Sequence, residues 1–416
     1  MSVSLPGTVT SWSPALTETA RLGVAVAGLG VAGQRDLAAV MAHPGVELVA
    51  VADQHEQLLA AAPAGVARYR DVADLCRDDR VDVVWVATPH ELHPLHARTA
   101  ATAGKHVIVE KPLALTPEEC DDITRVASSS EVVLVVGHTE SFAPDVRKAR
   151  ELIASGQFGP VRMIVTCNFT DFLYRPRRPE ELDTARGGGI VFAQLPHQVD
   201  VARFLTGSAV RAVRASVGAW DLDRPTEAAC TAFLDFASGC AASLVYSGYD
   251  HFDTRDISCA PERGTVRMPQ PGRARQQLGR MAAGHDSEAT ARVTRATALA
   301  AGGAGTGDPP FGFTLISCDG ADLRLAGHAV AVYGSDGYRE IGVEPSRGLP
   351  ARAEVLDELL AAVTRGRPAL HDGEWGRRTL EVCLAILRSA RERREVLLTL
   401  PDPVIETGDP SLARHR

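Results

Sequence analysis

A glycine-rich segment near the start of the chain has the spacing of a phosphate-binding turn. An apolar run leads into Gly28, Gly30 and Gly33, the pattern G-x-G-x-x-G. In this motif the first glycine permits a tight turn, the second lets the backbone approach a pyrophosphate, and the third lets helix and strand pack closely. The helix that starts around Val31 and Ala32 would then offer its N–H groups and the positive end of its dipole to phosphates. The match gains meaning because it follows a predicted strand and opens a predicted helix.

A carboxylate ends the next apolar run. Asp53 follows 46–52 and lies about 20 residues past the glycines, where an acidic residue hydrogen-bonds the ribose hydroxyls of a dinucleotide. A carboxylate at this position repels a 2′-phosphate, and no arginine follows immediately to accept one. We therefore predict NAD as the cofactor and consider NADP the weaker choice. The alternative, a plain turn with a surface aspartate, does not explain why strand, glycines, helix and acid occur in register.

A lysine follows a later apolar run, at a place where proton transfer could occur. Lys111 comes just after 106–109, at the carboxyl end of a predicted parallel strand, the edge where open α/β sheets bind ligands. Partial burial beside a positive nicotinamide would lower its pKa and make it a usable proton carrier. Without neighbouring motifs, a solvated loop lysine would be the better interpretation of Lys111. The preceding Glu110 could pair with Lys111, orient it, or point elsewhere.

The elements that must position these residues alternate in the first third of the chain. Apolar runs predict strands at 22–27, 46–52, 81–87, 106–109 and 132–137, with helices at 32–42, 71–77, 96–103 and 117–128. This alternation predicts a parallel sheet covered on both faces. Longer alternating segments at 161–169, 211–220, 227–235 and 241–246 predict an antiparallel sheet packed on the first unit.

We therefore expect an α/β Rossmann domain at 21–140, followed at 141–400 by an α+β domain with an open, mostly antiparallel sheet. A chain of 416 residues is too long for one ordinary core. Residues 1–20 are expected to be a leader and 401–416 a tail. The segment 269–310, rich in Gly, Ala, Arg and Thr, indicates an insertion with a helix at 287–299, and two more helices are expected at 353–363 and 375–392.

Composition narrows the class of protein. A chain with 45% hydrophobic and 23% charged residues is typical of a globular protein, and its net charge of -8 argues against nucleic-acid binding. Without a signal-peptide pattern or a membrane-length apolar run, we expect a cytoplasmic protein with no membrane partner. The eight cysteines lack a CxxC pair, so neither zinc nor disulfides are expected. His90, His93 and His96 share a spacing of three, but Pro94 interrupts a regular helix, and no metal is expected.

Further motifs follow one another in a recognisable order. The sequence A-T-P-H-E-L-H spans 87–93, G-K-H-V-I-V-E-K-P-L spans 104–113, and a glycine triplet at 187–189 precedes H-Q-V-D at 197–200. This combination resembles the glucose-fructose oxidoreductase, inositol dehydrogenase and rhizopine-catabolism family (Gfo/Idh/MocA), from about Arg21 to Leu398. The Glu-Lys-Pro element is its most specific part. The resemblance implies that the nicotinamide of NAD lies between the two domains, with further cofactor contacts from Thr88, Pro89, His93 and Glu110.

The resemblance also implies roles at the reacting centre. Lys111 would lie beside the nicotinamide and the reacting hydroxyl, and Pro112, usually cis in the family, would turn the chain so that the lysine points into the cleft. His197 would bind the substrate hydroxyl or shuttle its proton. Asp200, one helical turn later, would bind substrate, orient the histidine, or simply lie on the helix surface.

The chain departs from the sugar-oxidising members at one position. These usually carry Asp four residues after the glycine triplet, where this chain has Ala193, followed by Gln194. Gln194 is expected to contact the substrate instead. The incomplete Asp–His pair puts a standard sugar or inositol activity in doubt and shifts the proton transfer to Lys111 and His197.

A loop before the glycine triplet carries Arg175, Arg177 and Arg178. Arginine offers paired donors that match a carboxylate, so these residues are candidates for binding a cyclic, carboxylated small molecule. The alternative is a surface loop in which they pair with Glu180, Glu181 and Asp183.

This loop, the segments 311–314 and 332–334, and the region after the triplet resemble a branch of the family that includes phthalate 4,5-dihydrodiol dehydrogenases. The resemblance implies oxidation of a cis-dihydrodiol to a ketone that tautomerises to a catechol. Because aromatisation makes the step nearly irreversible, the enzyme needs positioning and one proton acceptor more than a strong catalytic pair.

Two alternatives remain open from the sequence. One is a sugar, polyol or inositol-type dehydrogenase of the same family, and the other is a catalytically idle protein that binds NAD. The resemblance further implies a homodimer or homotetramer formed through the open sheet.

Overall fold

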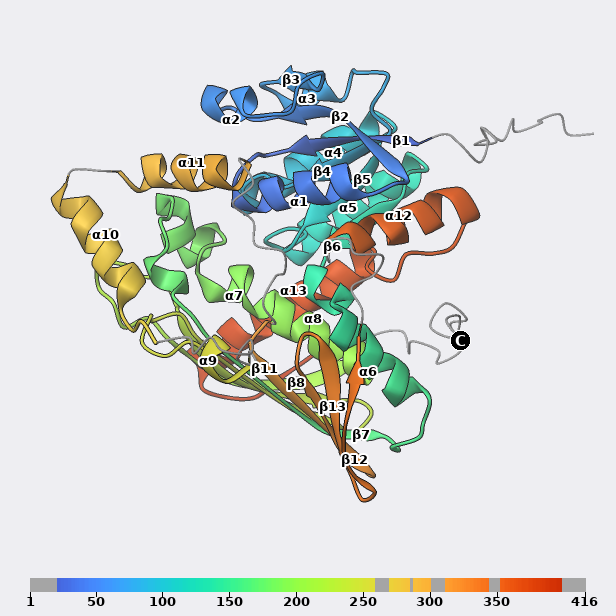
Figure 1. Cartoon of the computed structure of the whole chain (residues 1–416), viewed down its shortest axis with the longest axis vertical. Coiled ribbons are helices and arrows are strands. Elements are labelled where there is room, and N and C mark those ends of the chain that lie inside the picture. Colours follow the sequence, from blue (N-terminus) through green and yellow to red (C-terminus); the bar gives the residue numbers. More distant parts are fainter. Residues whose placement is uncertain (1–20, 259–268, 285–286, 301–310, 344–351, 399–416) are drawn as a thin grey trace, which may run out of the picture.

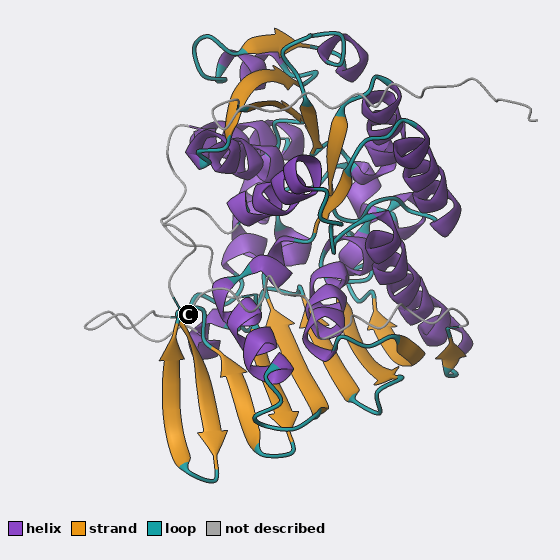
Figure 2. Cartoon of the chain, turned by 90° about the vertical axis from the view of Figure 1, so that its right-hand side faces the viewer, coloured by secondary structure: helices purple, strands orange, loops and turns teal. Residues whose placement is uncertain are grey.

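The computed structural model describes residues 21–258, 269–284, 287–300, 311–343 and 352–398. The expected leader at 1–20 and tail at 401–416 lie outside the described residues, as do parts of the expected insertion. Two sheets lie one above the other with helices between them (Figures 1 and 2). None of the described helices has both the length and the apolar character needed to cross a membrane.

The first sheet is the predicted Rossmann unit. Its six strands are all parallel and run in the order β3-β2-β1-β4-β5-β6. The strand order reverses between β1 and β4, and ligands of such sheets bind in the crevice at the carboxyl ends of these strands. The strands are β1 Leu22–Ala27, β2 Val46–Ala52, β3 Ala67–Tyr69, β4 Val83–Val86, β5 His106–Glu110 and β6 Leu134–Gly137. The helices are α1 Val31–Ala42, α2 Glu56–Ala60, α3 Val72–Leu75, α4 His93–Thr102 and α5 Pro117–Ser129.

The second sheet has nine strands in the order β14-β13-β12-β11-β7-β10-β9-β8-β15. Only the β7–β10 pair is parallel, which confirms an open, mostly antiparallel sheet. The strands are β7 Val161–Phe169, β8 Val210–Gly218, β9 Ala229–Phe236, β10 Ala241–Ser247, β11 Phe313–Cys318, β12 Ala321–Leu325, β13 Ala329–Gly334, β14 Gly337–Gly342 and β15 Val396–Leu397. The β11–β14 strands were not predicted.

Helices cover one face of the second sheet. These are α6 Pro144–Ala154, α8 Leu195–Thr206 and α13 Gly373–Glu392, and their apolar residues share one core with the inward-facing strand residues. On the other face, the side chains of Met163, Phe233 and Tyr333 remain 44–46% exposed. The homo-oligomer expected through this sheet stays a prediction.

The C-terminal part of the chain returns to the Rossmann unit. Helix α12, Ala353–Arg365, places Val355, Leu356 and Leu359 in the same buried cluster as the residues of β1. Helix α13 contributes Leu380 to the other Rossmann cluster and Ile386 to the core of the second sheet. The two layers are therefore joined by shared helices.

The insertion forms a two-helix arch, which we define as α10, Arg273–Ala283, and α11, Glu288–Ala298. Helix α11 confirms the helix expected at 287–299, whereas α10 was not predicted. Helix α11 packs on α1 and α2 and buries Ala296 in the Rossmann core. Helix α10 contacts the short helix Phe172–Tyr174, which follows β7, so the arch bridges the two domains (Figure 1).

Candidate active site

The glycine turn leaves room for a pyrophosphate at the start of α1. Gly28 has a φ of +93°, and a side chain on Gly33 would place its Cβ 1.8 Å from the carbonyl oxygen of Gly28. Above Gly30 a Cβ would meet no atom within 4 Å, so the backbone there faces open space. No side chain caps the N-terminus of α1, and the N–H groups of its first turn, from Val31 and Ala32 on, have no partner within the helix. This cradle fits the phosphates of NAD.

Asp53 stands against the same turn. Its Oδ2 accepts a hydrogen bond from the backbone N–H of Leu29 at 2.7 Å, and its Oδ1 accepts from the N–H of His55 at 2.8 Å. The side chain of Asp53 is 10% exposed. An ionised carboxylate has about four lone-pair sites, so acceptor capacity remains for a ribose hydroxyl.

Two histidines, His93 and His96, hold the loop that follows β4 in place. The ring of His93 is fully buried and lies 2.8 Å from the carbonyl oxygens of both Thr88 and Pro112. His93 was expected to contact the cofactor, but its buried ring instead ties this loop to the end of β5. Thr88 hydrogen-bonds His96 at 2.9 Å, and Pro89 precedes the short helix His90–Leu92.

Lys111 lies at the carboxyl end of β5, and the Lys111–Pro112 peptide is cis, as the resemblance implied. The Nζ of Lys111 donates to the carbonyl oxygen of Ala193 at 2.7 Å. This oxygen is the last of α7, Gly189–Ala193, and the final carbonyls of a helix lack partners within it. Burial lowers the pKa of Lys111 to about 8. The amine is therefore able to lose and regain a proton close to neutral pH.

Glu110 does not pair with the neighbouring lysine. Its Oε1 accepts from the guanidinium of Arg352 at 2.8 Å, and the same guanidinium contacts the buried Asp36 of α1. Glu110 is only 5% exposed. It thus connects β5 to the dinucleotide helix, instead of offering its carboxylate to the cofactor as expected.

The glycine triplet carries α7 and α8 into the cleft. At Gly189, which has a φ of +78°, a Cβ would lie 2.0 Å from Oε1 of Glu227, and this carboxylate accepts from the N–H of Val191 near the start of α7. The next helix bears His197, which is 8% exposed and packs against the Phe311 ring at 4.9 Å between ring centroids. Among the described residues, no group hydrogen-bonds the Nδ1 atom of His197. Burial, and then the charge of Lys111, lowers the pKa of His197 well below its usual value, so the ring is neutral and close to Lys111.

Tyr246, at the end of β10, joins the site although the sequence pattern did not indicate it. Its hydroxyl lies 2.8 Å from the Thr170 hydroxyl and donates to Oε1 of Gln194 at 3.2 Å. Burial raises the pKa of Tyr246 to about 12, so the hydroxyl stays protonated. Gln194 directly follows the carbonyl that holds Lys111. The alternating pattern of 241–246 indicated a strand with one buried face, but nothing local marked this hydroxyl.

Asp200 lies in the core rather than in the cleft. It is fully buried, and its Oδ1 accepts from the indole Nε1 of Trp375 at 2.6 Å. The rings of His138 and His371 lie 4.0 and 3.9 Å from the same oxygen. Helix α8 is buried from Leu195 to Leu205, so the turn after His197 faces protein. Neither the expected substrate contact nor a position on the helix surface fits this burial.

Two of the three loop arginines are engaged within the protein. Arg177 stacks over the Phe172 ring at 3.8 Å and donates to the Phe172 carbonyl oxygen at 2.6 Å. Arg178 donates to both carboxylate oxygens of Glu91 at 2.7 and 3.3 Å. Glu91 belongs to the Rossmann unit, so this ion pair joins the domains. Both arginines were candidates for binding substrate, and their geometry gives them structural partners instead.

Arg175 is different. Its Nε donates to Oδ1 of Asp171 at 2.8 Å, and its side chain lines a cavity of about 710 Å³. The expected alternative, pairing with nearby glutamates, applies to Arg177, which approaches Glu181 at 3.5 Å. It also applies to Arg178, which approaches Glu180 at 3.8 Å and Glu181 at 3.6 Å.

In the described part of the chain, no group of three or more His, Cys, Asp or Glu side chains is placed to hold a metal ion. His90, one of the three closely spaced histidines, has its Nδ1 at 3.2 Å from the carbonyl oxygen of Gly187.

Residues 22–138 match an oxidoreductase family with an NAD-binding Rossmann fold, and 146–267 match the GFO/IDH/MocA C-terminal domain. The 1-carboxy-3-chloro-3,4-dihydroxycyclohexa-1,5-diene dehydrogenase of Comamonas testosteroni is 38% identical over 311 residues, which cover 72% of this chain and 77% of that protein. The fold and site define an NAD-dependent dehydrogenase that acts on CH–OH groups. Within that class, the chain belongs to the Gfo/Idh/MocA family.

Solved structures agree with this assignment. The crystal structure of a dehydrogenase from Bordetella bronchiseptica superposes with a TM-score of 0.82 at 39% identity, covering 91% of this chain and all of that one. An oxidoreductase from Agrobacterium radiobacter in complex with NAD+, L-tartaric acid and magnesium shares the fold, with a TM-score of 0.67 at 18% identity over 91% of this chain and 98% of that one.

Proposed function

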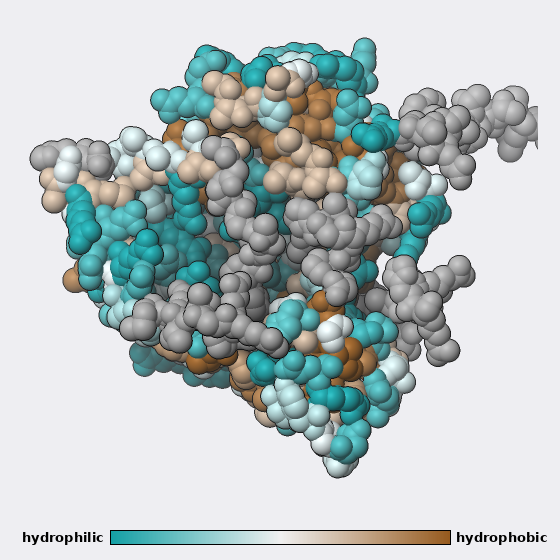
Figure 3. All heavy atoms as spheres, in the orientation of Figure 1, coloured by the Kyte–Doolittle hydropathy of each residue, from teal (hydrophilic) through white to brown (hydrophobic). Residues whose placement is uncertain are grey.

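We propose that this protein oxidises a ring cis-dihydrodiol carboxylate of the phthalate 4,5-dihydrodiol type to the corresponding catechol. The observation that carries this proposal is the similarity over most of the chain to a dehydrogenase whose name specifies a carboxylated cyclohexadiene diol. Two features of the chain support it. Ala193 replaces the acid expected of a sugar-oxidising site, and the face of the molecule below helix α11 is mostly hydrophilic (Figures 1 and 3).

Lys111 would act as the proton acceptor. NAD, when bound in the cleft, supplies the acceptor for the hydride that leaves the ring carbon. A neutral amine at Nζ takes the proton of the reacting hydroxyl as the carbonyl forms. The pKa of about 8, caused by burial, keeps a useful fraction of the amine neutral at the pH of a cell.

His197 and Tyr246 would position the diol. His197 has a neutral ring and a nitrogen without a partner among the described residues, which suits a hydrogen bond to one ring hydroxyl. Tyr246 fixes Gln194, whose backbone follows the carbonyl that orients Lys111. These side chains hold the ring in place, and positioning contributes much of the rate when the reaction itself is favourable.

The absence of an acid at position 193 fits this reaction. Oxidation of a sugar alcohol is readily reversible and gains from a relay that removes the proton completely. The ketone formed from a cyclohexadiene diol tautomerises to an aromatic catechol, so one proton acceptor suffices. We therefore retain Lys111 as the single base, with His197 beside it.

The test is NADH formation by the purified protein with the cis-4,5-dihydrodiol of phthalate, compared with myo-inositol and glucose. We expect reduction of NAD with the dihydrodiol and little with the other two. Activity with inositol or glucose alone would refute the aromatic substrate and leave the family assignment standing. NADH binding without turnover of any ring diol, sugar or polyol would favour a catalytically idle protein.

A further inference from the structure

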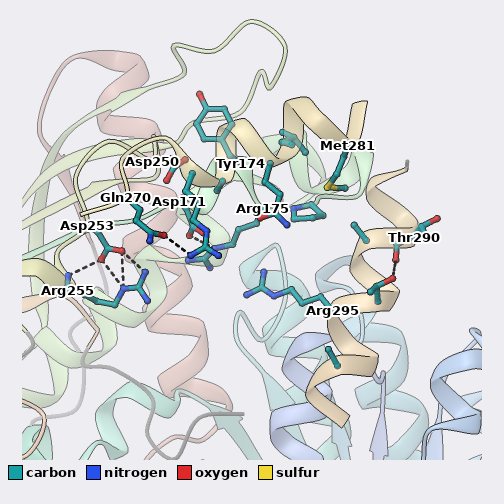
Figure 4. Close-up of a pocket in the computed structure, with 18 residues that line it drawn as sticks. Asp171, Tyr174, Arg175, Asp250, Asp253, Arg255, Gln270, Met281, Thr290 and Arg295 are labelled. Atoms are coloured by element: carbon teal, nitrogen blue, oxygen red, sulfur yellow. Dashed lines mark hydrogen bonds and ion pairs between the residues drawn. The ribbon is translucent and has the colours of Figure 1, made fainter. Parts of the chain in front are cut away.

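A cavity lies between the arch and the loop that follows β7. Its volume is about 710 Å³, within the range of pockets that hold small molecules. Four arginines and three aspartates line it, together with apolar residues of α10 and α11 such as Leu278, Met281 and Ala298. Figure 4 shows these side chains converging on the cavity from the arch on one side and the loop on the other.

Arg295 reaches into this cavity from α11 with an unused guanidinium. In Figure 4 its side chain extends from the helix toward the loop that carries Arg175. Among the residues that the structure describes, none forms a hydrogen bond or an ion pair with Arg295. The Arg295 side chain is exposed overall, and partial desolvation together with the positive charge of Arg175 lowers its pKa. Both guanidinium groups line the same cavity.

Asp171 does not satisfy both arginines. It accepts one hydrogen bond, from Nε of Arg175 at 2.8 Å, and among the described residues the terminal nitrogens of that guanidinium have no hydrogen-bond partner. Two cations facing one carboxylate leave a net positive charge. Such a pair is suited to an anion with two oxygens, because each guanidinium presents parallel donors.

The other arginines of the cavity already have partners. Arg255 forms an ion pair with Asp253 at 2.5 Å, and Arg273 donates to Oε1 of Gln270 at 2.7 Å. Gln270 is neutral, so Arg273 keeps its positive charge, and Asp250 adds a third carboxylate to the lining. Arg175 and Arg295 are the two arginines on the side of the cavity shared by the loop and α11.

A continuous set of contacts connects this pair to the proton acceptor. Thr170, next to Asp171, hydrogen-bonds Tyr246, and Tyr246 donates to Gln194. The residue before Gln194 holds Nζ of Lys111 through its carbonyl oxygen. The charges of Arg175 and Arg177 also affect the pKa of Tyr246, which burial raises. Arg175, through Asp171, and Lys111 therefore lie at the two ends of one series of contacts, whereas Tyr246 and Gln194 lie outside the lining of the cavity.

We propose that Arg175 and Arg295 together bind the carboxylate of the substrate while Lys111 faces its ring hydroxyl. This inference rests on the proposed dihydrodiol activity and assigns the carboxylate to the arch instead of to Arg177 and Arg178. Because α11 is docked on α1 through Ala296, the arch places one substrate-binding residue from the second domain directly over the cofactor-binding domain.

The experiment compares Arg295→Gln with Arg280→Gln. Arg280 is an exposed residue of α10 that does not line the cavity. The Arg280→Gln substitution therefore removes the same charge from the arch without changing the cavity, and it serves as the matched control. We expect Arg295→Gln to raise KM for the carboxylated dihydrodiol about 10- to 100-fold, the loss of a charged hydrogen bond, with a smaller change in kcat. KM for the uncarboxylated cis-dihydrodiol of benzene should stay within about twofold, and Arg280→Gln should resemble the wild type.

A binding measurement separates this inference from the proposed function. With NADH present, titration calorimetry compares 3,4-dihydroxybenzoate with catechol, which differ only by the carboxylate. We expect tighter binding of the carboxylated ring in the wild type and loss of that advantage in Arg295→Gln. Equal binding of the two rings, equal effects of Arg295→Gln on both, or a rise only in KM for NAD would overturn the carboxylate site. A wild type that binds the carboxylated ring more tightly but turns over no dihydrodiol would refute the proposed function alone.

Discussion

The side chain of Lys111 offers the sharpest test of the chemistry, because its pKa sets the pH dependence. The pKa is lowered by burial from the ordinary 10.5 to about 8. At pH 8 roughly half of the lysine is then neutral, whereas an unperturbed lysine would be neutral in roughly one molecule in 300. A base must be neutral to accept a proton, so kcat/KM should rise about tenfold per pH unit below pH 8 and level off above it.

Removing the amine gives the expected magnitude. General base catalysis contributes about 10²- to 10⁴-fold, which corresponds to about 3–5 kcal/mol in the activation free energy. We expect Lys111→Ala to lose this factor and the rise with pH. Lys111→Arg should lose as much, because a guanidinium retains the positive charge and donors but does not deprotonate in proteins.

Initial rates of NADH formation between about pH 6 and pH 10 measure these effects for the three proteins. Both variants also disturb the hydrogen bond to Ala193, so thermal unfolding and NADH titration serve as controls for fold and cofactor binding. A profile that is flat below pH 8, or an arginine variant with wild-type rates, would refute Lys111 as the proton acceptor.

Three further predictions concern the cofactor site and the core. Gly33→Ala forces a Cβ to within 1.8 Å of the Gly28 carbonyl oxygen; overpacking costs about 1–3 kcal/mol, so Tm and NADH affinity in a fluorescence titration should fall, and wild-type values would contradict the close contact. Asp53→Ala removes the ribose acceptor, so the ratio of kcat/KM for NAD over NADP should fall about tenfold or more; an unchanged ratio would show that Asp53 does not discriminate. Trp375→Phe leaves the buried Asp200 without its donor and should cost about 1–3 kcal/mol in urea unfolding with KM unchanged, whereas a changed KM would return Asp200 to the substrate site.

The elements predicted best are those whose signal is local. Strands β1, β2 and β7 begin and end at the predicted residues, because strands buried on one or both faces need apolar runs or strict alternation. The missed elements lack this constraint. Strand β14 is largely exposed at the sheet edge, and α10 has no fully buried residue. Neither element therefore needs a regular apolar face that the sequence would reveal.

The candidate site divides in the same way. The glycines and Asp53 were predicted because a dinucleotide turn favours those residues at a fixed spacing, whereas the prediction for Lys111 depended on the neighbouring motifs and the family resemblance. The places of Tyr246 and Arg295 in the site follow from contacts with residues far away in the sequence. Tyr246, for example, hydrogen-bonds Gln194, 52 positions earlier, and no local sequence pattern indicates such a contact. The sequence indicated that Asp200 lies one helical turn after His197. Whether its side chain faces the cleft or the core depends on the packing of α13 against α8, where Trp375 donates to Asp200.

This division bears on how specificity is built. The cofactor half relies on backbone contacts at the glycine turn, where substitutions meet main-chain atoms and are poorly tolerated. In the proposed site, the substrate half would rely on side chains from a loop and an inserted arch, and Arg295 lies on a different element from the main chain that holds Lys111. A chain can therefore keep its hydride-transfer geometry while the charge of the arch selects which ring enters. If Arg175 and Arg295 bind the substrate as we propose, the carboxylate, more than the diol, should distinguish that substrate from an uncharged sugar.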